Sequence, residues 1–362
     1  MGFKCGLVGL PNAGKSTVFN AITNLNVEAS AYPFCTIKPH FGIVPLKDDR
    51  LDRIQRIVGS AKKTETVLEF VDIAGLVRGA SRGEGLGNRF LSHIGQVDAV
   101  AQVVRCFEDD NVAHSYGSLD PKRDAEMITT ELILKDLELV ERQIANVAHA
   151  AKTGNKDAQK TMGVLESIRQ PLSEGKELRT LPLSENQQEL ICRNNLLTVK
   201  PVIFIANVDE NHVSGGPLIR RLKDHARSAD APCILFAGKI QAEIAELDQT
   251  EQLEFLKAMD LDETGLQKMV RAGYEVLDLI TFFTANENEA HAWTVPRSTP
   301  VATAAGKVHT DFAEKFIKAE VISISDLIRL GSIKAVHDKG LAAIHGRDYL
   351  VKDGDLILFK TS

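Results

Sequence analysis

Short apolar segments and helical patterns alternate over the first hundred residues of the chain. The apolar segments predict strands at Phe3–Val8, His40–Leu46, Val67–Asp72 and Asp98–Arg105, and the intervening patterns predict helices at Lys15–Leu25, Leu51–Gly59 and Gly87–Gly95. These strands lack strict alternation, which is typical of a parallel sheet that helices cover on both faces. Strand signals at Pro201–Ala206 and Pro232–Ala237 would complete this sheet. The pattern therefore predicts an α/β domain with a mostly parallel sheet.

A long helical pattern interrupts the strands from about residue 124. Its apolar residues recur at alternating steps of four and three, the spacing of one stripe in a coiled-coil-like pair: Ile133, Leu137, Val140, Ile144, Val147 and Ala151. Thr153–Asn155 is typical of a turn, and a second apolar stripe with Leu165 and Ile168 follows it. We predict an inserted helical hairpin, followed by a short helix that a Ser184–Gln187 capping box begins.

Beyond Gly273 the chain changes to short alternating segments broken by Gly, Pro and Asn, which indicates a separate small α+β domain. No helix longer than Ser325–Leu330 is expected there. The predicted organisation is a first part of the α/β domain at 1–123, the hairpin insertion at 124–198, the second part of the α/β domain at 199–277, and the small domain at 279–362.

Composition places the chain among ordinary soluble globular proteins, with 44% hydrophobic and 25% charged residues in 362. A net charge of -6 argues against a wholly basic nucleic-acid binder, so no DNA is expected as a partner. No apolar run approaches the roughly 20 residues that span a bilayer, and no signal-peptide pattern is expected at the start. The five cysteines are scattered without Cys-x-x-Cys spacing, which favours reduced thiols and a cytoplasmic location.

The segment from Gly9 to Ser16 matches the pattern Gly-x4-Gly-Lys-[Ser/Thr] between a predicted strand and a predicted helix, the context that a P-loop requires. Glycines let successive N–H groups point at phosphate oxygens, and the helix N-terminus adds its positive dipole end. Lys15 would supply a point charge to the β and γ phosphates, and the Ser16 hydroxyl would ligate Mg²⁺. The predicted nucleotide contacts of this segment are Asn12, Ala13, Gly14, Lys15, Ser16 and Thr17.

Companion motifs narrow the class to a GTPase-like switch. Asp72–Gly75 follows a strand and matches Asp-x-x-Gly, so that Asp72 would hold Mg²⁺ through a water and the Gly75 N–H would meet the γ-phosphate. Thr36, between the two motifs, is a candidate to complete the Mg²⁺ shell, although the residues alone favour an ordinary turn threonine.

The base motif departs from that of GTPases, which carry Asn-Lys-x-Asp after the corresponding strand. Here Asn207, Val208 and Glu210 occupy the recognition positions. A carboxylate one methylene longer than aspartate would be misplaced for guanine, and a site built to hydrogen-bond one group depends strongly on that geometry. We hypothesise that ATP binds at least as well as GTP.

With these residues assembled, the sequence closely resembles the YchF subfamily of Obg-related translation-factor GTPases, also called Obg-like ATPases, over nearly its whole length. Its most specific segments are Asp72–Asn88, Tyr32–Pro39 and Asn207–Glu210, and Ala305–Phe312 resembles the TGS domain, a β-grasp module. The resemblance implies Mg²⁺-dependent ATP hydrolysis with some GTP use, association with ribosomes, and a magnesium-binding role for Thr36. Ala237-Gly238-Lys239 departs from the Ser-Ala-Lys that GTPases often carry near the base.

The group that positions the attacking water is an open question. Leu76 stands where Ras-like enzymes have a glutamine, and a hydrocarbon side chain cannot orient water. His114, and after it His93, is a candidate, since an imidazole that titrates near neutral pH can position or activate water. A surface or capping histidine is the alternative for each. Asn12 suggests that K⁺ neutralises phosphate charge, although a loop asparagine that bonds its own backbone is an equal alternative.

Partners are expected from the resemblance and from one basic cluster. Lys152, Lys156 and Lys160 gather at the predicted hairpin tip, where ribosomal RNA could bind, although such clusters often form only a solvated face. Three functions stay open: an ATP-driven switch on the ribosome, a guanine-specific GTPase switch, and an RNA-binding scaffold with little turnover.

Overall fold

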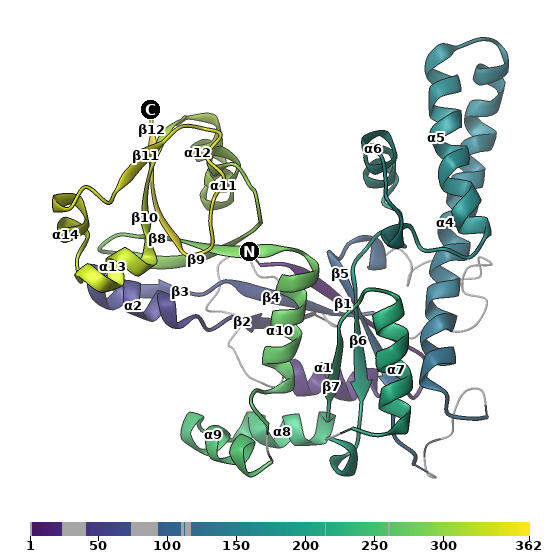
Figure 1. The fold of residues 1–362 in the computed structure, drawn as a ribbon, viewed down its shortest axis with the longest axis horizontal. Coiled ribbons are helices and arrows are strands. Elements are labelled where there is room, and N and C mark those ends of the chain that lie inside the picture. Colours follow the sequence, from purple (N-terminus) through teal and green to yellow (C-terminus); the bar gives the residue numbers. More distant parts are fainter. Residues whose placement is uncertain are drawn as a thin grey trace.

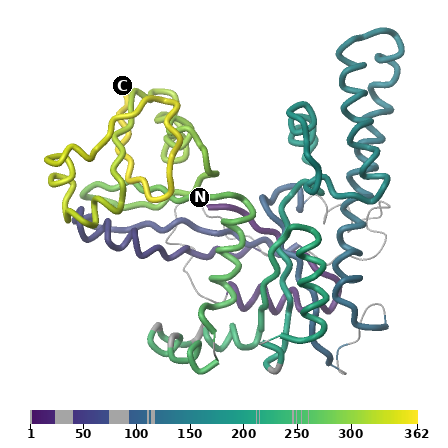
Figure 2. The backbone as a smooth tube through the Cα atoms, viewed as in Figure 1, coloured from purple at the N-terminus to yellow at the C-terminus, as the bar shows by residue number. Residues whose placement is uncertain are grey.

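The computed structural model describes residues 2–23, 41–73, 93–109, 112, 117–213, 215–259 and 261–362 (Figures 1 and 2). Two sheets and one long helical hairpin that projects away from them make up this part of the chain. Within it, no helix combines the length and the apolar character that crossing a membrane requires.

The first sheet contains six strands in the order β2-β4-β1-β5-β6-β7. Only β2 runs antiparallel to its neighbour, β4, and the other pairs are parallel, which confirms the predicted mostly parallel sheet. The strands are β1 (Lys4–Gly9), β2 (Phe41–Pro45), β4 (Val67–Asp72), β5 (Ala99–Arg105), β6 (Val202–Asn207) and β7 (Cys233–Phe236).

Helices cover both faces of this sheet, as its non-alternating apolar strands require. One face packs against α4 (Pro121–Lys152), α7 (Pro217–Ser228), α8 (Gly238–Glu246) and α9 (Gln249–Ala258). The other face packs against α1 (Lys15–Thr23) and α10 (Gly265–Val276).

The predicted hairpin is formed by α4 and α5 (Lys156–Ser173). Ile133 and Val140 of the predicted stripe are buried against Leu165 and Ile168 of the second arm. The chain returns through a 3₁₀ turn, η3 (Leu178–Thr180), and α6 (Glu185–Asn194), whose Ser184–Gln187 capping box has both of its hydrogen bonds. The α4 helix begins at Pro121, just before the predicted start of the insertion.

A buried carboxylate fixes the root of the hairpin. Asp136 of α4 accepts hydrogen bonds from the Leu197 N–H at 2.8 Å, the Thr198 N–H at 2.8 Å and the Thr198 hydroxyl at 2.6 Å. Burial raises the pKa of Asp136, and these three donors oppose that shift. The carboxylate thereby ties the first arm to the segment that leads back into β6.

The second sheet has the order β11-β10-β12-β8-β9-β3. Its elements from the C-terminal part of the chain are β8 (Leu279–Ala285), β9 (Glu289–Pro296), α11 (Val301–Val308), α12 (Thr310–Glu314), β10 (Phe316–Ser323), α13 (Ile324–Leu330), α14 (Ile333–Asp338), β11 (Ala343–His345) and β12 (Asp355–Thr361). The expectation of no helix longer than Ser325–Leu330 is wrong, because α11 has eight residues and α13 has seven. Val301, Ala304, Ala305 and Val308 form an apolar stripe at i, i+3, i+4 and i+7, which packs α11 on the sheet.

An arm from the first part of the chain completes this second sheet. It consists of α2 (Asp49–Val58), which Asp48 and Gly59 cap, and β3 (Lys62–Thr64), which pairs in parallel with β9. Leu51 and Ile54 of α2 are fully buried in a cluster with residues of β8, β9, β10 and β12. The helix was predicted, but its place on the C-terminal sheet was not, because periodicity does not identify the surface that an apolar stripe covers.

We expect Ile54→Ala to lower the free energy of unfolding of the C-terminal sheet by about 2 to 4 kcal/mol, since the site is closed and leaves a cavity. Trp293 of β9 is the only tryptophan in the sequence, so its fluorescence during urea denaturation reports on this sheet. The matched control, Ile317→Ala, removes the same atoms from a side chain that is 56% exposed, and should change the free energy by less than about 0.5 kcal/mol. Equal midpoints for the two variants would contradict the assignment of α2 to this core.

The stability of this sheet should depend on pH through His291, which stacks on Trp293 with ring centroids 3.8 Å apart. Burial lowers the pKa of His291 to about 4, against the pull of Glu289. The unfolded value is about 6.5. The unfolded chain therefore binds the proton more readily than the folded one. The contribution of neutral His291 to the free energy of unfolding is full above about pH 6.5 and is lost as the pH falls towards 4. Urea midpoints measured at pH 7.5 and 5.0 should differ less in His291→Gln than in the original protein; an equal drop in both excludes His291 as the cause.

Candidate nucleotide site

The candidate site lies where the carboxyl ends of the parallel strands meet. β1 is flanked by β4 on one side and by β5 on the other, so the loop that follows it leaves the sheet at a topological switch point, the position where open α/β sheets bind ligands. This loop, residues 10–14, leads directly into α1. The predicted P-loop therefore has its expected strand–loop–helix context.

The loop takes a backbone path that few residues adopt. Asn12 has φ 65° and Gly14 has φ 85°, both in the left-handed region that glycine and asparagine tolerate best. Ala13 is buried, whereas Ser16 and Thr17 are exposed in the first turn of α1. This turn directs its free N–H groups and the positive end of the helix dipole towards a bound anion.

Asn207 braces the loop from β6. Its side-chain amide donates a hydrogen bond of 3.0 Å to the Ala13 carbonyl, and the residue is only 4% exposed. A Cβ atom on Gly14 would lie 2.0 Å from the Asn207 Nδ2 atom, so the brace fits only over a glycine. The predicted site residue Asn207 thus acts on the phosphate loop itself.

Lys15 and Asp72 meet although 57 residues separate them. The Lys15 ammonium contacts the Asp72 carboxylate at the end of β4, and the side chains are 11% and 14% exposed. The hydroxyl of Ser16 and the carboxylate of Asp72 are oxygen donors, the kind that Mg²⁺ prefers. The residues present therefore fit a magnesium–phosphate group, with Lys15 as the counter-charge.

The predicted base-contact residues follow β6. Val208 is buried at 4% exposure among apolar residues, so its side chain belongs to the core, and its role as a base contact stays a prediction. Asp209 is engaged by the His212 Nδ1 atom at 2.5 Å. Glu210 is exposed at the start of a 3₁₀ turn, η4 (Glu210–His212). Gly238 packs closely on Thr17 and brings the loop that starts α8 beside α1.

Arg105 is a site residue that the sequence interpretation missed. It ends β5, is 5% exposed, and donates to the carbonyls of Phe107 at 3.0 Å, Asp109 at 3.0 Å and Val112 at 2.8 Å. It also borders a small cavity behind the P-loop, together with Asn12 and Asp124. A charged residue that ends an apolar strand beside a P-loop was the available signal.

Several predicted residues lie outside the described residues: Thr36, Gly75, Leu76 and His114. His93 is described, as an exposed residue in a helical turn at 93–95.

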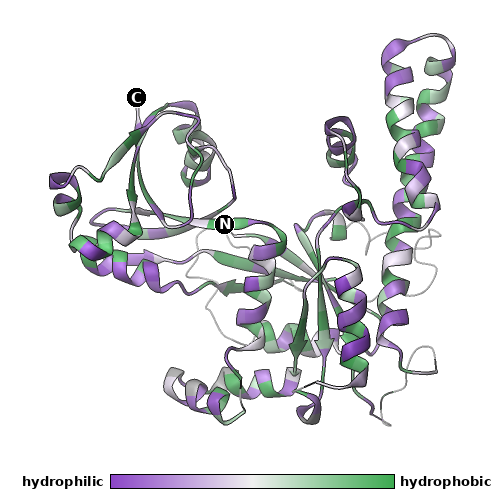
Figure 3. Ribbon diagram, in the orientation of Figure 1, coloured by the Kyte–Doolittle hydropathy of each residue, from purple (hydrophilic) through white to green (hydrophobic). Residues whose placement is uncertain are grey.

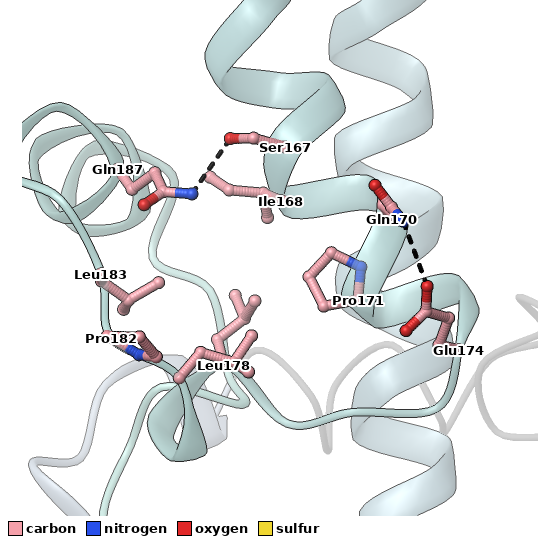
Figure 4. Close-up of a pocket in the computed structure, with 10 residues that line it drawn as sticks. Ser167, Ile168, Gln170, Pro171, Glu174, Leu178, Pro182, Leu183 and Gln187 are labelled. Carbon is pink, nitrogen blue, oxygen red and sulfur yellow. Dashed lines mark hydrogen bonds between the residues drawn. The ribbon is translucent and has the colours of Figure 1, made fainter.

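A separate cavity of about 270 Å³ lies at the base of the hairpin (Figure 4). Its walls are mainly apolar, with Ile168 and Pro171 from α5 facing Leu178, Pro182 and Leu183. The described lining offers no cation for a phosphate. This cavity is therefore distinct from the candidate nucleotide site.

Two family models match the chain, one in its N-terminal part and one in its C-terminal part. Residues 4–145 match a family model described as a 50S ribosome-binding GTPase. Residues 279–362 match the family model YchF-GTPase_C, described as a protein of unknown function.

Relatives match over the whole length. The chain is 45% identical over 359 residues to the ribosome-binding ATPase YchF of Escherichia coli O157:H7, with 99% of each chain covered. It is 43% identical over 363 residues to the protein of that name in Bacillus subtilis, again with 99% of each covered. The solved structure of the Schizosaccharomyces pombe YchF GTPase superposes with a TM-score of 0.88 at 33% identity, and covers 99% of this chain and 97% of that one.

We predict that Gly14→Ala lowers nucleotide affinity at least tenfold, since the new methyl group displaces Asn207 and the loop loses its brace. Gly59→Ala is the matched control, because Gly59 has a similar φ of 78° but open space around it. Left-handed strain alone costs about 1 kcal/mol at either position. Titration of a fluorescent nucleotide separates the two effects: equal affinities in both variants would mean that the Asn207 contact does not shape the site.

Proposed function

The chain belongs to the YchF family, and from this premise we propose that it is a Mg²⁺-dependent P-loop nucleoside triphosphatase that prefers ATP, also binds GTP, and acts as a nucleotide-dependent switch on the ribosome. The observation that carries this proposal is the convergence of Lys15, Asp72 and the Asn207-braced loop at one edge of the sheet.

In this proposal the N–H groups of Ala13 and Gly14 hold the phosphates, and Lys15 turns from Asp72 to the β and γ phosphates. Ser16 would hold Mg²⁺ directly and Asp72 would hold it through a water, and the metal would supply neutralisation of the phosphate charge. Thr36 and Gly75 keep the magnesium and γ-phosphate roles expected for them.

The nucleotide preference rests on Glu210 and its neighbours. Asp209 is occupied by His212, and Glu210 carries the longer side chain on an exposed 3₁₀ turn. Asp209 is thus already engaged, and Glu210 is one methylene longer than the aspartate that selects guanine. The alternatives are a guanine-specific switch, since the Schizosaccharomyces pombe relative is called a GTPase, and a scaffold with little turnover.

The attacking water needs a group other than Leu76. We keep His114 as the candidate catalytic residue beside Lys15, with His93 as the second choice. The left-handed conformation of Asn12 supports a conformational role for that residue, and K⁺ assistance is the alternative to it.

Binding to the ribosome follows the names of the relatives, and we propose ribosomal RNA as the contact. We further propose that the protein is cytoplasmic and binds neither membranes nor DNA. We assign residues 279–362 to a TGS-type β-grasp domain of an Obg-related protein, and retain the domain division at 1–123, 124–198, 199–277 and 279–362.

The function is tested by phosphate release and by competing titrations of labelled ADP and GDP. We expect multiple turnovers of ATP that Lys15→Ala abolishes, and ADP bound at least as tightly as GDP. Glu210→Asp, which restores the shorter carboxylate, should shift the ratio of affinities towards GDP by about tenfold, the effect of one positioned contact of about 1.4 kcal/mol. A clear guanine preference in the original protein would sink the proposed ATP preference, and absence of turnover would favour the scaffold.

A further inference from the structure

The α7 helix presents a basic face to solvent. Its buried side, with Ile219, Leu222 and Ala226, packs on the first sheet, while Arg220, Lys223 and Arg227 are exposed. Spacings of three and four residues place these three cations along one side of the helix, over about 10 Å. We call them the α7 basic face. Figure 3 shows the hydrophilic side of α7 turned away from the sheet.

Several arginines on the other described helices are neutralised within their own helix. Arg142, Arg193 and Arg329 each pair with a carboxylate one turn earlier, at 2.6, 2.8 and 2.5 Å. The α7 helix holds one acidic residue, Asp224, which lies 3.2 Å from Arg227.

Within the part of the chain that the structure describes, Arg220, Lys223 and the neighbouring Arg221 form no ion pair. Burial lowers the pKa of His225, so that this residue adds no charge near neutral pH. The α7 helix thus carries four cations against one carboxylate, in a chain whose net charge is -6.

We propose that the α7 basic face binds the phosphate backbone of RNA, and, resting on the proposed function, that this RNA is ribosomal. Guanidinium groups bind phosphate in bidentate geometry, and a phosphate backbone repeats its charge along a line as the three cations do. Such contacts bind without reading sequence.

The position of α7 makes this surface independent of the hairpin tip. It lies beside the first turns of α4, where His225 is 4.0 Å from Glu126 (Figure 1). From Glu126 to Lys152 the α4 helix carries the chain about 39 Å further. Removing charge at one place therefore leaves the other unchanged.

The test replaces Arg220→Gln, Lys223→Gln and Arg227→Gln together in the full chain, since glutamine keeps helix propensity. The matched control replaces Lys152→Gln, Lys156→Gln and Lys160→Gln, which removes the same charge from the tip. Binding to purified ribosomes and to naked ribosomal RNA is measured over a range of KCl. The α7 variant should bind both at least tenfold more weakly, with the slope of log affinity against log salt reduced by about 2 to 3. Melting temperature and ribosome-free ATP turnover should not change.

Unchanged affinity and slope in the α7 variant would overturn the inference, whereas ribosome binding by the original protein would still uphold the proposed function. Weaker ribosome binding with unchanged binding to naked RNA would make the partner a ribosomal protein and also overturn it. If the original protein sediments with ribosomes in no nucleotide state, the proposed function fails, and the naked-RNA measurement then decides on α7 alone.

Discussion

The hydrogen bond from the Asn207 amide to the Ala13 carbonyl is the interaction on which the candidate site depends. It joins the end of β6 to the loop after β1, across the intervening strand β5. The parallel register that pairs Gly9 with Val103 and Arg105 with Asn207 brings the two ends level. A bond of this kind contributes only about 1 kcal/mol to stability, yet it sets the path of the phosphate loop, because Gly14 can pass beneath it only without a Cβ atom.

The sequence predicted those features whose cause is local. A P-loop requires its own glycines and lysine, and a helical hairpin requires a stripe at steps of four and three, so both could be recognised along the chain. Asp72 could be predicted because it opens an Asp-x-x-Gly motif directly at the end of a strand. The Lys15–Asp72 contact itself depends on the neighbouring places of β1 and β4, which no local pattern records.

Long-range features escaped prediction for the same reason. The apolar stripe of α2 suits either sheet, and only β3 pairing with β9, reinforced by Arg50 reaching Asp353 at 2.6 Å, commits it to the C-terminal one. Val208, just after β6, is buried in a cluster with Ile219 and Leu222 of α7, a burial that its motif position does not show. Arg105 is held by three backbone carbonyls of the loop that follows β5. The direction of a carbonyl depends on the backbone conformation of that loop, which the sequence does not show.

The hairpin helix α4 is hydrogen-bonded to the strands that border the candidate nucleotide site. These bonds constrain how the hairpin and the site can move relative to each other. Gln102 of β5 donates to the Ala125 carbonyl at 2.9 Å, and Asp124 borders the cavity behind the P-loop, so the first turns of α4 are attached to the strand beside that loop. The turn before β5 is attached as well, because Lys200, just before β6, donates to the Val97 carbonyl at 2.7 Å. Asp136 of α4 accepts from Thr198, in the segment that leads from the hairpin back into β6, and so joins this segment to α4. A displacement of α4 or of the segment before β6 must therefore be accommodated around Asp136, where a buried carboxylate with three donors resists local adjustment.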